Sequence, residues 1–348
     1  MSSDVGPVAL PPNQPPQFYR GGAAITALRG TTDERHGHGP EDWVGSTTTL
    51  FGEDTAGLSR LPDGRWLRDA VGADPEGWLG AEHTSAFGDS TALLVKLLDA
   101  GQRLPVHFHP SDAFARRHFD SHFGKSEAWI VIGTTGADPR VHVGFTEPHS
   151  AKEINDWVRD QDAPEMLHAL NSVAVRPGDT VYVPAGLPHA IGAGVFVVEL
   201  QQPTDFSLTL EWRDFLAEPE KGHLGLGFET AIEALDTSGW DETRLATLIR
   251  RTGDENAAAV RLLADGADRY FRAERLCPSP ALVLEPSFAV LVVLDGSGLL
   301  RTEHGSTLEI GRGDTLVLPH RAGQVELAGG LTAIRCRPPL PGKETQNV

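Results

Sequence analysis

The sequence predicts a mainly β protein built from two antiparallel β-barrels or jelly rolls, with helical segments between and around them. Short alternating apolar segments, separated by Gly-Asp, Pro-Gly and Ala-Gly turns, fill two blocks of the chain. Amphipathic helical spacing lies between the blocks. A repeat supports the division, because GDTVYVPAGLPHA from Gly178 is echoed by GDTLVLPHRAGQV from Gly313.

These patterns divide the chain into five regions. The first is Pro-rich and polar, and it predicts a flexible arm because it can bury little apolar surface. We expect an arm at residues 1–17, a first barrel with an N-terminal elaboration at 18–227, a helical connection at 228–276, a second barrel at 277–340 and a polar tail at 341–348.

The periodicity predicts each element in turn. Residues 91–101 are apolar enough for a buried strand, in which Lys96 needs a partner because an unpaired buried ammonium is costly. Pro110 and the polar residues after it predict a short helix over residues 111–119. Residues 149–170 have helical spacing with a break at a proline. Further strands are predicted within residues 124–134, 140–146, 172–202, 204–215 and 281–336.

Two histidines in the first block are candidate metal ligands. Residues 104–109 alternate as a strand, so His107 and His109 should point to the same face. Two such imidazoles suit zinc, iron, manganese or nickel, but they need further ligands. Glu127, which heads the next apolar run, and His189, which follows a turn, complete a reasonable catalytic set. The alternative is a surface His-x-His pair, which can arise by chance among 14 histidines.

The second block lacks most of this set. Its GSGLLRTEH segment has Thr302 where the first block has His107, and Gln324 stands where the first has His189. We interpret the remaining His304 as a surface or structural residue. Only the first barrel is therefore expected to hold a metal.

Composition excludes several classes of function. A formal net charge of −18 argues against nucleic-acid or anionic-membrane partners, which are bound through Lys and Arg. Two widely spaced cysteines, Cys277 and Cys336, favour a reduced compartment. We see no secretory signal and no apolar run that could span a bilayer. We therefore expect a cytoplasmic protein with a small-molecule substrate, and the oligomeric state stays open.

The two histidine segments fit a known pattern. GxxxxxHxH followed by a Glu, and then GxxxxxPxGxxH, is typical of the cupin superfamily, and residues 101–109 and 178–189 fit both halves. LLVKLLDA, VHFHPSDAFA, GKSEAW, PGDTVYVPAGLPHAIG and VVELQQPTD resemble, in order and spacing, motifs of class I mannose-6-phosphate isomerases. The likeness covers about residues 91–206. It implies paired cupin barrels, one zinc ion, and interconversion of mannose 6-phosphate and fructose 6-phosphate.

The resemblance also implies roles for single residues. His109, Glu127 and His189 fall on zinc-ligand positions, and His107 falls where the family usually has a glutamine ligand. That change keeps a metal donor. The other positions that the likeness assigns are those near the sugar or its phosphate: Lys96, Lys125 and Asp205.

Two positions depart from the family. Pro105 replaces a serine beside the ligands, and Thr209 stands where the family carries an arginine with a catalytic or phosphate-binding role. Arg213, four residues further along the same alternation, is the candidate substitute. These departures leave the metal ligands in place but remove an arginine that could bind the phosphate of the substrate.

The resulting hypothesis is a metal-dependent aldose–ketose isomerase that acts on a sugar or sugar phosphate. A divalent metal, for which we expect Zn²⁺, would act as Lewis acid while a proton moves between C1 and C2. The candidate catalytic residues are Lys125, Asp205, Lys96 and Arg213. Two alternatives stay open: a non-catalytic sugar-binding cupin, suggested by the missing arginine, and an iron-dependent cupin oxygenase, which His107 makes less remote.

Overall fold

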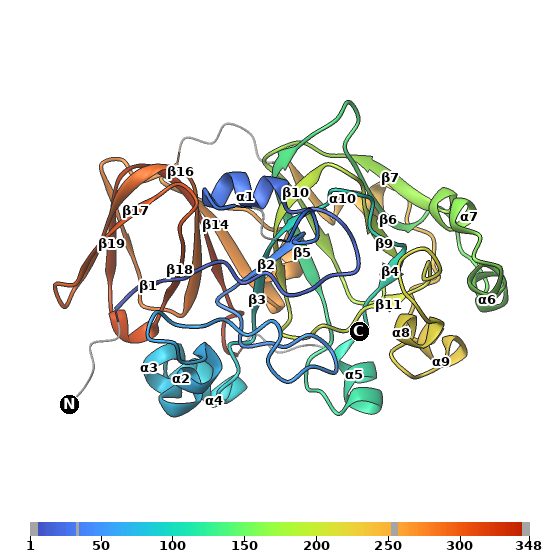
Figure 1. Ribbon diagram of the computed structural model, residues 1–348, viewed down its shortest axis with the longest axis horizontal. Coiled ribbons are helices and arrows are strands. Elements are labelled where there is room, and N and C mark those ends of the chain that lie inside the picture. The colour runs from blue at the N-terminus through green and yellow to red at the C-terminus, as the bar shows by residue number, and fades with distance from the viewer. Residues whose placement is uncertain (1–5, 33–34, 252–256, 343–348) are drawn as a thin grey trace.

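The computed structural model describes residues 6–32, 35–251 and 257–342. Two β assemblies lie side by side, one formed mainly by the first two thirds of the chain and one by the last third (Figure 1). The strands form three sheets in which neighbouring strands are antiparallel. The predicted mainly β class is confirmed.

Two sheets form the first assembly. The six-stranded sheet has the order β12-β8-β5-β10-β3-β2, and the five-stranded sheet has the order β11-β4-β9-β6-β7. Most of their strands are buried along their whole length and read as near-continuous apolar runs. Their bounds are β2 Glu41–Val44, β3 Leu94–Asp99, β4 His107–Phe108, β5 Glu127–Thr134, β6 Arg140–Phe145, β7 Leu170–Ala174, β8 Asp179–Val183, β9 His189–Ile191, β10 Val195–Gln201, β11 Leu208–Thr209 and β12 Ile249–Arg251.

One eight-stranded sheet forms the second assembly. Its main path runs β1-β18-β16-β19-β14-β13, while β15 pairs with β19 and β17 pairs with β16. The bounds are β1 Val8–Ala9, β13 Ala259–Arg261, β14 Arg272–Leu276, β15 Ala281–Leu284, β16 Ala289–Thr302, β17 Thr307–Gly311, β18 Thr315–Leu318 and β19 Val325–Arg337.

The two assemblies share apolar core. Alternate residues of a strand face opposite sides. On β19, Ile334 and Cys336 pack in the same cluster as Val95 of β3 and Val131 of β5. Ala333, the residue before Ile334, faces the opposite side and belongs to the interior of the second assembly. One face of the second sheet therefore packs on the first.

The helices cover the outside of the sheets (Figure 1). The predicted helices near residues 111–119 and 149–170 are present, the second as α6 and α7 with a break between them. Ser111 caps α5 by accepting a hydrogen bond from the backbone N–H of Phe114 at 3.3 Å.

The bounds of the helices are α1 Ala23–Arg29, α2 Leu67–Ala73, α3 Pro75–Leu79, α4 Ala81–Phe87, α5 Asp112–Phe119, α6 Ala151–Asp160, α7 Ala163–His168, α8 Pro219–Gly222, α9 Phe228–Ile232 and α10 Glu242–Ala246, with 3-10 turns η1 Asp265–Arg269 and η2 His320–Ala322.

The helical expectation for residues 228–276 is wrong for much of that region. Only α9 and α10 are α-helical there, and β12, β13, η1 and β14 follow in the described part. On β13, Val260 is buried between the exposed Ala259 and Arg261, which is the period of a strand. Pairing of β13 with β14 and of β14 with β19 supplies these backbone groups with partners that local helical spacing does not reveal.

The expected flexible arm is also wrong for residues 6–17. Val8 and Ala9 pair with Val317 and Leu316 of β18, and the side chain of Asn13 bonds the carbonyls of Trp43 and Gly57. These backbone contacts do not require a long apolar run, so composition alone misses them. Residues 1–5 lie outside the described residues, as does most of the predicted tail. Among the helices that the structure describes, none is long and apolar enough to cross a membrane.

Candidate metal centre and sugar cavity

Pairing between short strands brings the predicted histidines together. In the five-stranded sheet, His107 of β4 lies opposite His189 of β9 and opposite Thr209 of β11. Glu127 begins β5 in the six-stranded sheet. The cluster therefore lies between the two sheets, inside the first assembly. One ring nitrogen from each of His107, His109 and His189 lies within 4.8 Å of the others.

Backbone carbonyls set the orientation of the three imidazoles. The Nδ1 atoms of His107, His109 and His189 lie 2.9, 2.8 and 2.7 Å from the carbonyl oxygens of Pro105, Phe206 and Leu187. A carbonyl can only accept, so each Nδ1 carries the proton. Each Nε2 is then unprotonated and can offer its lone pair, as is typical of imidazoles that bind a metal.

Burial keeps the imidazoles of His107 and His109 neutral. Desolvation and the neighbouring imidazoles hold the pKa of His107 well below its usual range. Burial, together with the ammonium of Lys125, lowers the pKa of His109 to about 3. Although burial alone would raise it, Lys125 and His109 hold the pKa of Glu127 well below its usual value. His107 and His109 thus offer neutral imidazoles beside an ionised carboxylate.

The donors of this cluster fit a divalent cation. Glu127 Oε2 lies 3.0 Å from His109 Nε2, and Glu127 Oε1 lies 3.3 Å from His189 Nε2. Within the described part of the chain, the buried Nε2 of His189 forms no hydrogen bond. Such an atom needs a partner, and a metal ion would supply one. The ammonium of Lys125 lies beside the set, 3.1 Å from both His109 Nε2 and Glu127 Oε2.

Lys96 has the partners that its burial requires. Its Nζ lies 3.3 Å from Glu41 Oε2 and 3.6 Å from Glu199 Oε1, and it stands 4.6 Å from the centre of the Trp43 ring. Although burial disfavours the ammonium, the two carboxylates raise the pKa of Lys96. Burial, with the nearby charge of Glu127, raises the pKa of Glu199 to about 7.

Glu41 and Glu199 are site residues that the sequence reasoning missed. Tyr19 and Trp43 donate hydrogen bonds to Glu41 at 2.5 and 2.6 Å. Glu199 is a lone carboxylate within the apolar run of β10, which is the same signal that drew attention to Lys96 in β3. The pairing of Lys96 with Glu199 across these two strands depends on their register, which the sequence does not show.

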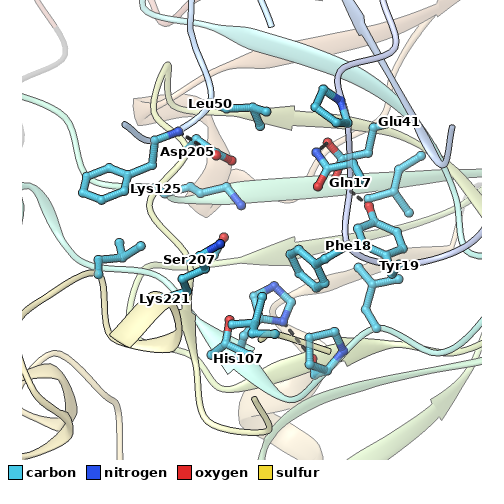
Figure 2. Close-up of a pocket in the computed structure, with 18 of the residues that line it drawn as sticks. Gln17, Phe18, Tyr19, Glu41, Leu50, His107, Lys125, Asp205, Ser207 and Lys221 are labelled. Atoms are coloured by element: carbon cyan, nitrogen blue, oxygen red, sulfur yellow. Dashed lines mark hydrogen bonds between the residues drawn. The ribbon is translucent and has the colours of Figure 1, made fainter. Parts of the chain in front are cut away.

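A cavity of about 710 Å³ opens above this cluster. Figure 2 shows Lys125 and His107 pointing into it, with Asp205 on one wall and Glu41, Gln17 and Tyr19 on the other. Such a volume lies in the range of small-molecule sites, about 300–1,000 Å³.

The structure brings most, but not all, of the predicted catalytic residues to this cavity. Lys96, Lys125 and Asp205 line it, and the Asp205 carboxylate accepts a hydrogen bond from the backbone N–H of Phe51 at 3.1 Å. Arg213 does not line it. Its side chain is exposed and lies 3.4 Å from the carbonyl oxygen of Asp160. The expectation that Arg213 substitutes for the missing arginine is therefore wrong, because the chain leaves the sheet after Thr209.

Comparison with known proteins agrees with this geometry. The chain is 30% identical over 263 residues to the mannose-6-phosphate isomerase of Streptococcus mutans, and the match covers 74% of this chain and 78% of that protein. It is 29% identical over 246 residues to the mannose-6-phosphate isomerase ManA of Bacillus subtilis, covering 70% and 73%.

The chain belongs to the class I mannose-6-phosphate isomerase family. No protein-family model matches it. The crystal structure of the mannose 6-phosphate isomerase from Bacillus subtilis superposes with a TM-score of 0.74 at 22% identity, covering 96% of this chain and 100% of that one. The apo form of the enzyme from Salmonella typhimurium gives 0.73 at 16%, covering 97% and 100%. At these identities the structures show a shared fold. This member of the isomerase family has Pro105 and Thr209 beside its histidines, where Thr209 is buried and lines the cavity.

Proposed function

We propose that this family member is a metal-dependent aldose–ketose isomerase for a sugar or sugar phosphate of the mannose–fructose type. One observation carries the proposal: three buried imidazoles, each with Nδ1 held by a carbonyl, bring ring nitrogens within 4.8 Å of one another, and His107 of this set lines the cavity. The relatives in Bacillus subtilis and Streptococcus mutans are mannose-6-phosphate isomerases, and this supports the substrate type.

His107, His109, Glu127 and His189 would hold one divalent ion, for which we propose Zn²⁺. When bound, the metal supplies Lewis-acid polarisation of the sugar oxygens at C1 and C2. The carbonyls of Pro105, Phe206 and Leu187 would keep the imidazoles in the required tautomer. A three-histidine and carboxylate set also accepts iron, so metal analysis decides between zinc and the redox alternative.

Carboxylates on the cavity wall could move the proton. Isomerisation transfers a proton between C1 and C2, and a general base works best with a pKa near the working pH. Glu199 lines the cavity and has a pKa of about 7. We propose Glu199 Oε1 as the proton carrier, held by Lys96 at 3.6 Å, with Lys125 and Asp205 positioned to contact the sugar hydroxyls.

A substrate screen tests the function. Metal-loaded protein is assayed with mannose 6-phosphate, mannose, fructose and related aldoses, with His189→Ala as the control. We expect aldose–ketose turnover that this variant loses, because His189 is fully buried among the proposed ligands. Tight sugar binding without turnover would contradict an isomerase and favour a sugar-binding cupin.

A further inference from the structure

The two buried lysines of the cavity are already neutralised or lie at its metal end, and its third lysine, Lys221, is exposed at the opening. Lys125 contacts His109, so it belongs where C1 and C2 of the sugar would react. Lys96 is paired with two buried carboxylates. Among the described residues that line the cavity there is no arginine. A phosphate at the far end of a hexose would therefore find neither a guanidinium nor an unpaired buried lysine.

The opening of the cavity is apolar and acidic. We call its exposed lining residues the rim: Pro16, Phe18, Phe51, Glu53, Glu220, Lys221 and Gly225. Two carboxylates thus face one ammonium, and the adjoining helix α8 has only four residues, too few for a strong helix dipole. A phosphate monoester carries a charge of about −1.5 to −2 at neutral pH, so this rim repels it more than it attracts it.

The two rim phenylalanines are held in aromatic clusters. Phe51 is 46% exposed and contacts the rings of Phe119 and Phe206 edge-on. Phe18 is 45% exposed and contacts the rings of Tyr19 and Phe215. Exposed rings fixed at the mouth of a cavity present apolar surface to a ligand. The C–H groups on the faces of an uncharged sugar ring suit this surface, whereas a phosphate dianion does not.

We propose that the substrate of this isomerase is an unphosphorylated sugar. The inference rests on the proposed function and narrows it, because it assigns the substrate class from the charge and apolar character of the rim. The family's phosphorylated substrate would meet Glu53 and Glu220 at the opening, and the buried Thr209 and Pro105 offer it no charge further in.

Steady-state kinetics of the metal-loaded protein test this proposal. We expect kcat/KM for mannose to exceed kcat/KM for mannose 6-phosphate by about tenfold or more, because like charges placed close together are strongly unfavourable. A preference for mannose 6-phosphate would overturn the inference and leave the isomerase function standing. Absence of turnover with every sugar would overturn the function and, with it, this inference.

Charge reversal at the rim tests the cause. In Glu53→Lys/Glu220→Lys we expect the ratio of kcat/KM for mannose 6-phosphate to that for mannose to rise by about tenfold, through attraction of the phosphate. Glu82→Lys/Glu309→Lys is a matched control with the same change in net charge, because both residues are exposed, on α4 and β17, and neither lines the cavity. A ratio that rises equally in the control, or that does not change in the rim variant, would contradict the proposal.

Discussion

Lys96 and Glu199 lie on adjacent strands of one cavity wall, and the opposite charge of each makes burial of the other less costly. Both side chains are almost fully buried, at 2% and 3% exposure. A buried ammonium is tolerated because Glu41 and Glu199 both lie near it, and this leaves two carboxylates sharing one cation. Burial, together with the nearby negative charge of Glu127, raises the pKa of Glu199 despite the ammonium of Lys96.

This environment predicts a pH dependence for the isomerase. A general base must be ionised, and burial raises the pKa of Glu199 to about 7. We therefore expect kcat to rise as pH increases through about 7 and to level off above it. Glu199→Gln should lower kcat by about 10²–10⁴-fold and remove this inflection while the metal content stays unchanged. A Glu199→Gln variant that keeps both its activity and the inflection would exclude Glu199 as the proton carrier.

At the scale of elements, a tight turn fixes two of the proposed ligands. Gly186 lies in the turn between β8 and β9 with φ of +88°, a conformation that side chains rarely adopt. Its backbone N–H donates a hydrogen bond to the carbonyl oxygen of His109 at 2.7 Å. The turn therefore sets the spacing between His109 and His189, which begins β9 three residues later.

We expect Gly186→Ala to weaken metal binding. A Cβ at this position would lie 3.1 Å from the carbonyl oxygen of Ala234, so the turn must shift. Gly136→Ala is the matched control, since Gly136 has φ of +86° but a Cβ there would meet no other residue within 4 Å. Both variants should lose about 1–2 kcal/mol of unfolding free energy, and only Gly186→Ala should raise the Kd for Zn²⁺ in a chelator competition. Equal metal affinity in the two variants would contradict this role of the turn.

The sequence predicts elements well where the signal is local. Pro110 and the capping residue Ser111 predict the helix near residues 111–119. The two-residue period of a strand predicts that His107 and His109 share a face. The register that joins Lys96 to Glu199 is set by tertiary pairing and cannot be read locally. Tertiary pairing also explains the error near residues 259–276. The amphipathic spacing there predicts a helix, but pairing with β19 makes part of the segment a strand.

At the scale of the whole molecule, the two assemblies share one continuous hydrophobic core, although the sequence predicts two barrel domains. Phe271, Val290 and Ile334 of the second assembly pack in the cluster that contains Val197 and Val131 of the first. Side chains in such a cluster lose their packing partners when either assembly opens. The domain boundaries themselves stay a prediction. The shared core favours unfolding of the two assemblies together.

We expect the molecule to unfold in one cooperative transition. All seven tryptophans lie between Trp43 and Trp240, and most belong to the first assembly, so their fluorescence reports mainly on it. Cys336 is fully buried in the shared core, so its reaction with a thiol reagent reports on the second. The two probes should give the same midpoint in urea. Exposure of the Cys336 thiol at a lower urea concentration than the fluorescence change would show independent units instead.

Metal titration of the stripped protein tests the central claim, that three histidines and Glu127 form one catalytic metal site, most directly. Zn²⁺ is added in increments while aldose–ketose turnover is measured with whichever sugar the screen identifies. We predict that activity rises linearly and levels off at one equivalent per chain, and that His189→Ala stays inactive throughout. Full activity in the stripped protein, or a plateau that the His189→Ala variant shares, would contradict the account.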